Sequence, residues 1–80
     1  MTVYMCKVYD AFLGDWIDLG VFSTQAKAEG AGENYIMESY PACVVIDWAR
    51  DVNVRTDWYQ DIDGRVNTRV VTECELDKVL

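Results

Sequence analysis

The chain has 80 residues, of which 51% are hydrophobic, and it carries a formal net charge of -7 at pH 7 with no histidine. This length allows one domain, residues 1–80, and the hydrophobic content excludes an acidic disordered tail. An acidic field repels a phosphate backbone, which argues against direct nucleic-acid binding, and the lack of histidine removes the commonest general base and transition-metal ligand.

The first part of the chain predicts a β-hairpin. Residues 2–9 and 16–22 alternate between apolar and polar positions, as half-buried strands do, and Gly14 lies in the connection between them. A short connection makes the two strands antiparallel neighbours. In the second strand, the alternation places three apolar residues together on one face: Ile17, Leu19 and Val21.

One helix is predicted from residue 25 to about residue 39. A hydroxyl residue, Ser23 or Thr24, supplies the N-cap directly before it. A single stripe at helical spacing begins with very small side chains and consists of Ala28, Ala31, Gly32, Tyr35 and Ile36. Because small residues let a helix axis approach its neighbour, we expect this stripe to pack closely on the sheet. Pro41 marks the end of the helix.

The remaining residues predict further strands. Residues 42–46 form a near-continuous apolar run, which is consistent with a strand buried on both faces. Residues 47–53 either extend this strand or form a turn. Residues 54–60 and 65–76 alternate on either side of a turn with Gly64 and should form an antiparallel hairpin. One face of the last strand carries Val66, Thr68, Val70, Thr72, Cys74 and Leu76.

These elements predict an α+β fold in the order ββαβββ. An antiparallel sheet of four to five strands carries one helix on one face. The lower number applies if residues 43–60 bend as one strand. The sequence contains no linker, repeat or low-complexity segment that would divide this arrangement.

The three cysteines, Cys6, Cys43 and Cys74, form no Cys-x-x-Cys pair, so a zinc ribbon or thioredoxin-type site is not supported. Cys6 and Cys74 alternate with apolar neighbours as core residues do. We therefore expect three free, buried thiols in a reducing cytoplasm, with neither a signal peptide nor a membrane span. No catalytic residue, cofactor or metal site is predicted. The chain has no histidine to activate a cysteine and no glycine-rich phosphate loop, and residues 59–70 lack two key ligands of a calcium loop.

Aromatic side chains, Phe12 and Trp48 among them, exceed what one helix and a thin sheet need for a core, and carboxylates gather at the predicted loops. Two interpretations stay open for the aromatic rings. They either cover the open sheet face as cross-strand pairs or anchor an interface, since Trp and Tyr dominate binding hot spots. The residues predicted to contact a partner are Asp10, Asp15, Trp16, Asp57, Trp58, Tyr59, Asp61 and Asp63.

In size, charge and architecture the chain resembles the small acidic phage-encoded proteins that inhibit host machinery, including anti-CRISPR and DNA-mimic proteins. The segment 21–29 also looks like the strand-to-helix junction of small ββα proteins from phages and bacteria. The resemblance implies a non-enzymatic protein–protein inhibitor in the host cytoplasm. It would bind a basic surface of a nucleic-acid-binding or defence protein. One version of this hypothesis is that the chain mimics DNA. The alternative is a homodimerising structural or regulatory domain that pairs through strand edges or the open sheet face.

Overall fold

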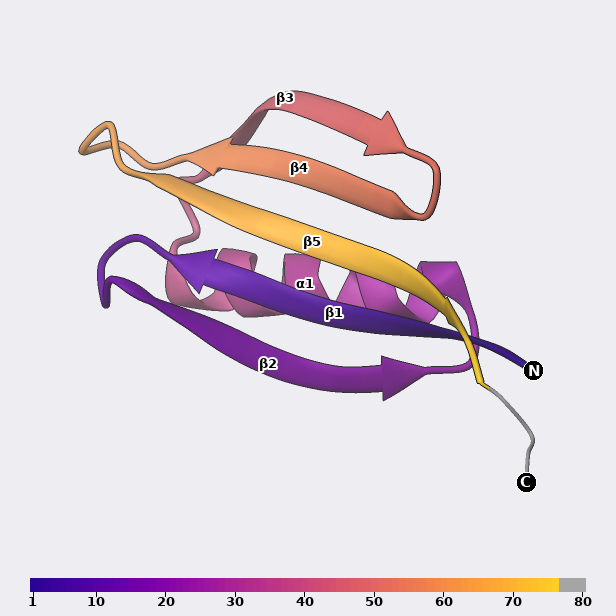
Figure 1. The fold of residues 1–80 in the computed structure, drawn as a ribbon. Coiled ribbons are helices and arrows are strands. Elements are labelled where there is room, and N and C mark those ends of the chain that lie inside the picture. Colours follow the sequence, from indigo (N-terminus) through magenta and orange to yellow (C-terminus); the bar gives the residue numbers. More distant parts are fainter. Residues whose placement is uncertain (77–80) are drawn as a thin grey trace.

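The computed structural model describes residues 1–76, which form one antiparallel sheet of five strands and one helix (Figure 1). In chain order the elements are β1 (Thr2–Asp10), β2 (Asp15–Phe22), α1 (Gln25–Ser39), β3 (Val44–Asp51), β4 (Val54–Gln60) and β5 (Val66–Glu75). Across the sheet the strand order is β2-β1-β5-β4-β3. The predicted ββαβββ α+β fold is confirmed with five strands, because a turn at residues 52–53 divides residues 44–60 into β3 and β4, and residues 47–51 extend β3.

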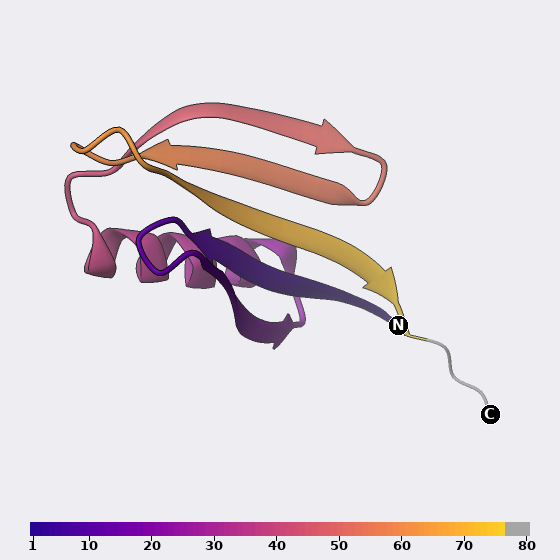
Figure 2. The same cartoon turned by 60° about the vertical axis from the view of Figure 1, so that its left-hand side comes forward.

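Helix α1 lies against β1, β2 and β5 on one face of the sheet (Figures 1 and 2). The Oγ1 atom of Thr24 accepts a hydrogen bond from the backbone N–H of Lys27 at 3.1 Å, so this residue is the N-cap. The buried residues of the helix all come from the predicted stripe: Ala28, Gly32 and Ile36. A Cβ atom at Gly32 would lie 2.6 Å from Cδ of Arg69 and 3.0 Å from Sγ of Cys6. Glycine is therefore what lets the helix approach β1 and β5.

The buried apolar side chains form two clusters between α1 and the central strands. The first cluster consists of Val8, Ile36, Cys43 and Tyr59. The second consists of Cys6, Ala28 and Val71. Leu19 of β2 packs against both clusters. The core therefore follows the length of the helix and ends near β4.

Two predicted side-chain orientations are wrong. In β2, Leu19 is the extra residue of a β-bulge opposite Cys6 and Lys7. The bulge reverses the alternation, so Val21 points away from the helix and is 59% exposed. In β5, Cys74 is only half-buried, because it lies on the face opposite the helix, whereas the thiols of the other two cysteines are buried as predicted.

Strand β3 is not the buried strand that its apolar run predicts. All eight of its residues are exposed, and it pairs with β4 alone. Only Cys43, directly before the strand, is buried. The reason is geometric: a helix about 10 Å in diameter covers only two or three strands that lie ~4.8 Å apart. The sheet is wider than the helix, and β3 stands at the edge that the helix leaves free.

Candidate partner-binding surface

Two loops lie side by side at one end of the sheet, as Figures 1 and 2 show. They are residues 11–14 between β1 and β2 and residues 61–65 between β4 and β5, and we call them together the loop end. The guanidinium carbon of Arg65 lies 4.8 Å from the centroid of the Phe12 ring, so the two loops are in contact. The backbone N–H of Ala11 also donates to Oδ1 of Asn67 at 2.8 Å.

The loop end exposes three large apolar side chains. Phe12 is 63% exposed, Leu13 is 62% exposed and Ile62 is 83% exposed. A single exposed apolar residue is ordinary, but several on loops that touch one another are typical of a contact surface. Phe12 stood out in the sequence as one of the surplus aromatic residues, whereas Leu13 and Ile62 were missed. The signal that could have found them is an apolar side chain in a hairpin loop.

Asp10 holds the first loop in place. Its Oδ1 atom accepts hydrogen bonds from the backbone N–H groups of Phe12 at 3.0 Å and Leu13 at 3.1 Å. The hydroxyls of Tyr35 and Tyr40 donate to the same carboxylate at 2.7 and 2.6 Å. Burial by itself would raise the pKa of Asp10, but these hydrogen bonds outweigh it, and the net pKa lies below the usual value. A charged carboxylate thus fixes the backbone that presents two of the exposed apolar residues.

The second loop is a tight turn stabilised by its own backbone. The N–H of Gly64, whose φ is +84°, donates to the carbonyl of Asp61 at 2.9 Å. The N–H of Asp61 donates to the carbonyl of Arg65 at 2.8 Å. The Oδ1 atom of Asp61 accepts from the N–H of Ile62 at 2.6 Å. The exposed side chain of Ile62 therefore projects from a backbone that is hydrogen-bonded on both sides.

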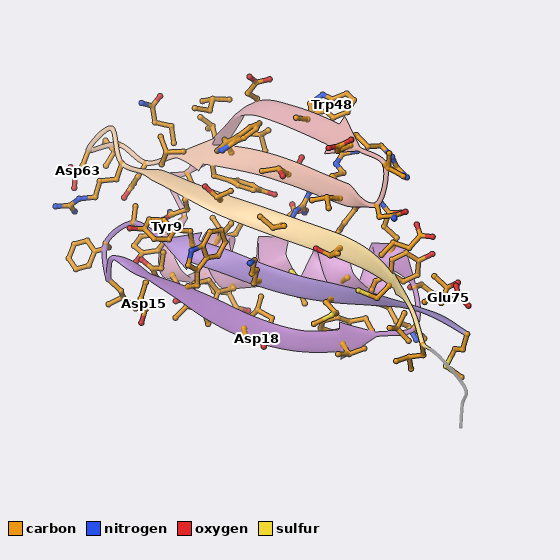
Figure 3. All side chains as sticks on the ribbon, viewed as in Figure 1. Tyr9, Asp15, Asp18, Trp48, Asp63 and Glu75 are labelled. Atoms are coloured by element: carbon orange, nitrogen blue, oxygen red, sulfur yellow. The ribbon has the colours of Figure 1, made fainter. Side chains whose placement is uncertain are left out.

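Carboxylates surround these apolar side chains. Asp15 and Asp63 are exposed at the same end of the sheet (Figure 3), and Asp61 is half-buried in the turn between β4 and β5. One basic side chain offsets them: Arg65 forms an exposed ion pair with Asp63 at 3.7 Å. The structure therefore brings together three of the carboxylates predicted to contact a partner, at a surface that remains acidic.

The aromatic row, defined as Trp16, Tyr9 and Trp58, crosses the open face next to the loop end. The open face is the face of the sheet away from α1. Tyr9 pairs in register with Trp16 on β2 and with Thr68 on β5, and Thr68 pairs in turn with Trp58 on β4. The Tyr9 and Trp16 rings meet edge to face with centroids 5.3 Å apart. Trp16 is exposed, whereas Trp58 is half-buried, so Trp16 offers more surface to a partner.

A hollow of about 420 Å³ adjoins Trp16 on the open face. Met5, Lys7, Asp18 and Thr72 contribute to its lining. The Nζ atom of Lys7 lies 4.6 Å from the centroid of the Trp16 ring, which holds the indole against β1. The hollow is large enough to receive a side chain of a bound protein.

Three of the residues predicted to contact a partner are instead buried, and that prediction is wrong for Asp10, Asp57 and Tyr59. Asp10 is 1% exposed and lies behind the loop that it holds. Tyr59 belongs to the core cluster around Ile36. Alternation on β4 placed Trp58 and Tyr59 on opposite faces, and the structure assigns Tyr59 to the helix side.

Asp57 belongs to a buried ion cluster. Nη2 of Arg69 donates to its Oδ2 at 2.7 Å, and Nη2 of Arg55 donates to its Oδ1 at 3.1 Å. Nη1 of Arg69 donates to the backbone carbonyl of Glu29 in α1 at 2.9 Å. Burial opposes ionisation, but the two arginines outweigh it and hold the pKa of Asp57 below its usual value. These residues, here called the Asp57 cluster, tie β4 and β5 to the helix.

Among residues 1–76, no three Cys, Asp or Glu side chains lie together as metal ligands would. The same part of the chain holds no helix with the length and apolar character needed to cross a membrane. Searches among protein-family models, curated proteins and solved structures find no match to this chain. Function must therefore be inferred from the geometry of the loop end and the open face.

Proposed function

We propose that this protein is a non-enzymatic inhibitor that binds a basic surface of a host protein through the loop end and the adjoining aromatic row. One observation carries the proposal: Phe12, Leu13 and Ile62 are exposed together on two touching loops whose backbones are fixed by hydrogen bonds. Carboxylates surround them, and the whole chain has a net charge of -7. An apolar tip inside an acidic surface fits an apolar depression inside a basic one.

The charged and apolar groups have different tasks in such an interface. Asp15, Asp61 and Asp63 raise the association rate and orient the partner, because electrostatic attraction acts before contact. The apolar side chains and Trp16 supply the affinity, at about 1.5–3 kcal/mol for each large side chain that becomes fully buried. Because Asp10 already orders the first loop, binding costs less conformational entropy than it would with a free loop.

Inhibition follows from occupancy, without chemical turnover. A basic surface that matches the loop end is typical of nucleic-acid-binding proteins, since they neutralise phosphates with Lys and Arg. The host targets that we favour are therefore nucleic-acid-binding or defence proteins. DNA mimicry is the specific form in which the acidic loop end occupies the nucleic-acid site itself.

The test is a capture experiment with matched variants. The wild-type protein, the double variant Phe12→Ser with Ile62→Ser and the control Val52→Ser are each immobilised and exposed to a lysate of the cell in which the protein acts. Val52 is also highly exposed but lies in the turn between β3 and β4, at the other end of the sheet. The expected partner is retained by the wild type and by the control and is lost with the double variant. Retention by the double variant would contradict the proposal.

Binding kinetics with the captured partner test the two tasks separately. Charge reversal at Asp61 and Asp63 should slow association and flatten its dependence on salt. Truncation of Trp16 to Ala should instead speed dissociation, with a loss of ~2 kcal/mol or more if the ring is an anchor. A partner with an acidic surface, or binding that is indifferent to salt, would rule the proposal out. Competition by a DNA duplex for the same partner distinguishes DNA mimicry from other modes of inhibition.

A further inference from the structure

The free edge of β3 is the least protected surface of the described chain. β3 pairs with β4 on one side only, and all eight of its residues are exposed, including Trp48 at 55%. Figure 3 shows Trp48 far from Asp15 and Asp63 of the loop-end surface. Natural edge strands are usually protected by lysine, by proline or by a covering element. β3 contains neither residue, and α1 lies against other strands; the one protecting feature of this kind in β3 is a β-bulge at Ile46.

We propose that β3 pairs antiparallel with β3 of a second copy of this chain, so that one continuous sheet runs across both molecules. Each copy contributes one β3, so a twofold axis closes the assembly at two chains. The other edge strand, β2, is less suited to pairing because α1 lies against it and its bulge at Leu19 interrupts the middle of the ladder, whereas the bulge of β3 at Ile46 leaves residues 47–51 in regular register. This inference does not depend on the proposed function, which uses the loop end and the open face and not the free edge of β3.

The distribution of charge favours a second copy at this edge over a basic partner. The hairpin of residues 44–60 carries three aspartates and two arginines, a net charge of -1 out of the total of -7. Two copies therefore repel each other least when they meet through this hairpin. A basic protein, in contrast, is attracted toward the acidic remainder of the molecule. β3 is best matched by a strand that is nearly neutral and apolar, and β3 of a second copy is such a strand.

The register of the hairpin indicates how two β3 strands would meet. A two-residue turn joins Asp51 to Val54, and the residues that close such a turn are hydrogen-bonded to each other. The backbone groups of Trp48 and Arg50 consequently point away from β4. Pairing about Ala49 places Trp48 opposite Arg50 of the second copy, and the same contact occurs twice.

The side chains suit this register. On β4, the guanidinium of Arg55 lies 4.6 Å from the centroid of the Trp48 ring, so the indole already receives one cation. Arg50 takes part in none of the ion pairs found among residues 1–76. Across the new interface, Arg50 of each copy gains a cation–π contact with Trp48 of the other.

Asp47 opposes this pairing and makes the strength of the dimer depend on salt concentration. Its Oδ1 atom accepts a hydrogen bond from the N–H of Trp48 at 2.8 Å, and that N–H is needed by the second copy. In the same register, Asp47 lies opposite Asp51 of the second copy, and like charges directly opposite destabilise a sheet. The dimer is therefore weak at low salt and tightens as salt screens these carboxylates. Salt has the opposite effect on the loop-end complex.

The test is sedimentation velocity of the whole chain from micromolar to millimolar concentration. The wild type should show a monomer–dimer equilibrium that shifts toward dimer with salt. Ile46→Lys on β3 should weaken it by about tenfold or more, because a charge is added to the pairing edge. Val21→Lys, the same kind of change at an exposed position of β2, should leave it unchanged. Asp47→Asn should tighten it by about threefold to tenfold, because a like-charge pair is removed.

Three outcomes would overturn the inference. The first is a wild type and an Asp47→Asn variant that both remain monomeric throughout the concentration range. The second is a dimer that Ile46→Lys leaves intact, and the third is a dimer that Val21→Lys abolishes. Circular dichroism of each variant checks that the fold is kept. Amide exchange gives an independent readout, because the N–H groups of Trp48 and Arg50 should become protected as concentration rises while those of β2 do not.

Discussion

The two halves of the sheet, the strands covered by α1 and the uncovered β3 edge, differ in the contacts that stabilise them. On β1, β2 and β5, side chains are packed under α1, and Val8 of β1 is fully enclosed in a cluster with Ile36 of the helix. On β3 no side chain is buried, and the strand is held by its ladder with β4. One helix can stabilise only the strands that it covers. The uncovered half is therefore free to present apolar surface, which is the property that a binding protein needs.

The two halves meet at the Asp57 cluster, which is polar. Asp57 on β4 accepts a hydrogen bond from Arg69 of β5, and Arg69 also donates to the backbone carbonyl of Glu29 in the helix. This cluster joins β4 and β5 to the helix by polar contacts, beside the apolar core that reaches β4 through Tyr59. Removing it should therefore separate the stability of the hairpin from that of the helix-covered half.

The largest effect is expected for Asp57→Ala. The change leaves two guanidinium groups without their carboxylate at a largely buried site, and breaking such a pair costs about 3–5 kcal/mol. Chemical denaturation measures the free energy of unfolding. The control is Asp63→Ala, whose exposed pair with Arg65 should contribute less than about 1 kcal/mol. Similar losses for both variants would show that the Asp57 cluster does not join the halves.

A pair of isoleucines compares the halves directly. Ile36→Ala removes a fully buried side chain under the helix and should cost about 2–5 kcal/mol. Ile46→Ala, on exposed β3, should change the free energy of unfolding by at most about 0.5 kcal/mol. Thermal or denaturant unfolding at low protein concentration measures both values without a contribution from association. A large loss at Ile46 under these conditions would mean that the hairpin is covered in the monomer.

The sequence predicted the helix and the two hairpins because their signals are local. Thr24 precedes the helix as an N-cap, the stripe of small residues has helical spacing, and Gly64 marks the last turn. The exposure of β3 was not predictable, because an apolar run does not tell how many strands one helix covers. The bulges at Leu19 and Ile46 were missed for a similar reason, since a single inserted residue leaves no mark in the sequence pattern of a strand.

Some residues of the candidate surface could be predicted from their position in or beside a loop alone. Asp15 and Asp63 are exposed at the loop end, and Trp16 is exposed beside it. The burial of Asp10 and Asp57 was not predicted, because it depends on partners that are distant in sequence as well as on near ones. The two tyrosines that bond Asp10 come 25 and 30 residues later, and the guanidinium that joins Asp57 comes 12 residues later. Patterns of alternation cannot reveal such contacts.

A smaller effect is expected for Tyr40→Phe, which removes one donor to Asp10. The loss should be about 1–2 kcal/mol at neutral pH. Burial and the bond to Asp10 raise the pKa of Tyr40 to about 12, above its ordinary value near 10. A raised pKa means that the contribution is complete below pH ~10 and is lost as pH rises through about 12. The stability of the wild type should therefore fall more steeply over this range than that of the variant, and equal slopes would contradict the assignment.

The smallest changes in the free energy of unfolding are expected for alanine substitutions at two glycines of α1, and the two changes should differ in sign. Gly30 has no atom within 4 Å of an added Cβ, so Gly30→Ala should stabilise by about 0.5–1 kcal/mol through helix propensity. At Gly32 the added methyl meets the middle of the Arg69 side chain, whose guanidinium is held by Asp57 and Glu29. Overpacking of about 1–3 kcal/mol should exceed the gain in propensity and leave a net loss near 1 kcal/mol. Denaturant midpoints of the two single variants measure both signs. If Gly32→Ala also stabilises, the helix does not lie as close to β1 and β5 as the core requires, and the contrast between the covered and uncovered halves is weaker than the structure indicates.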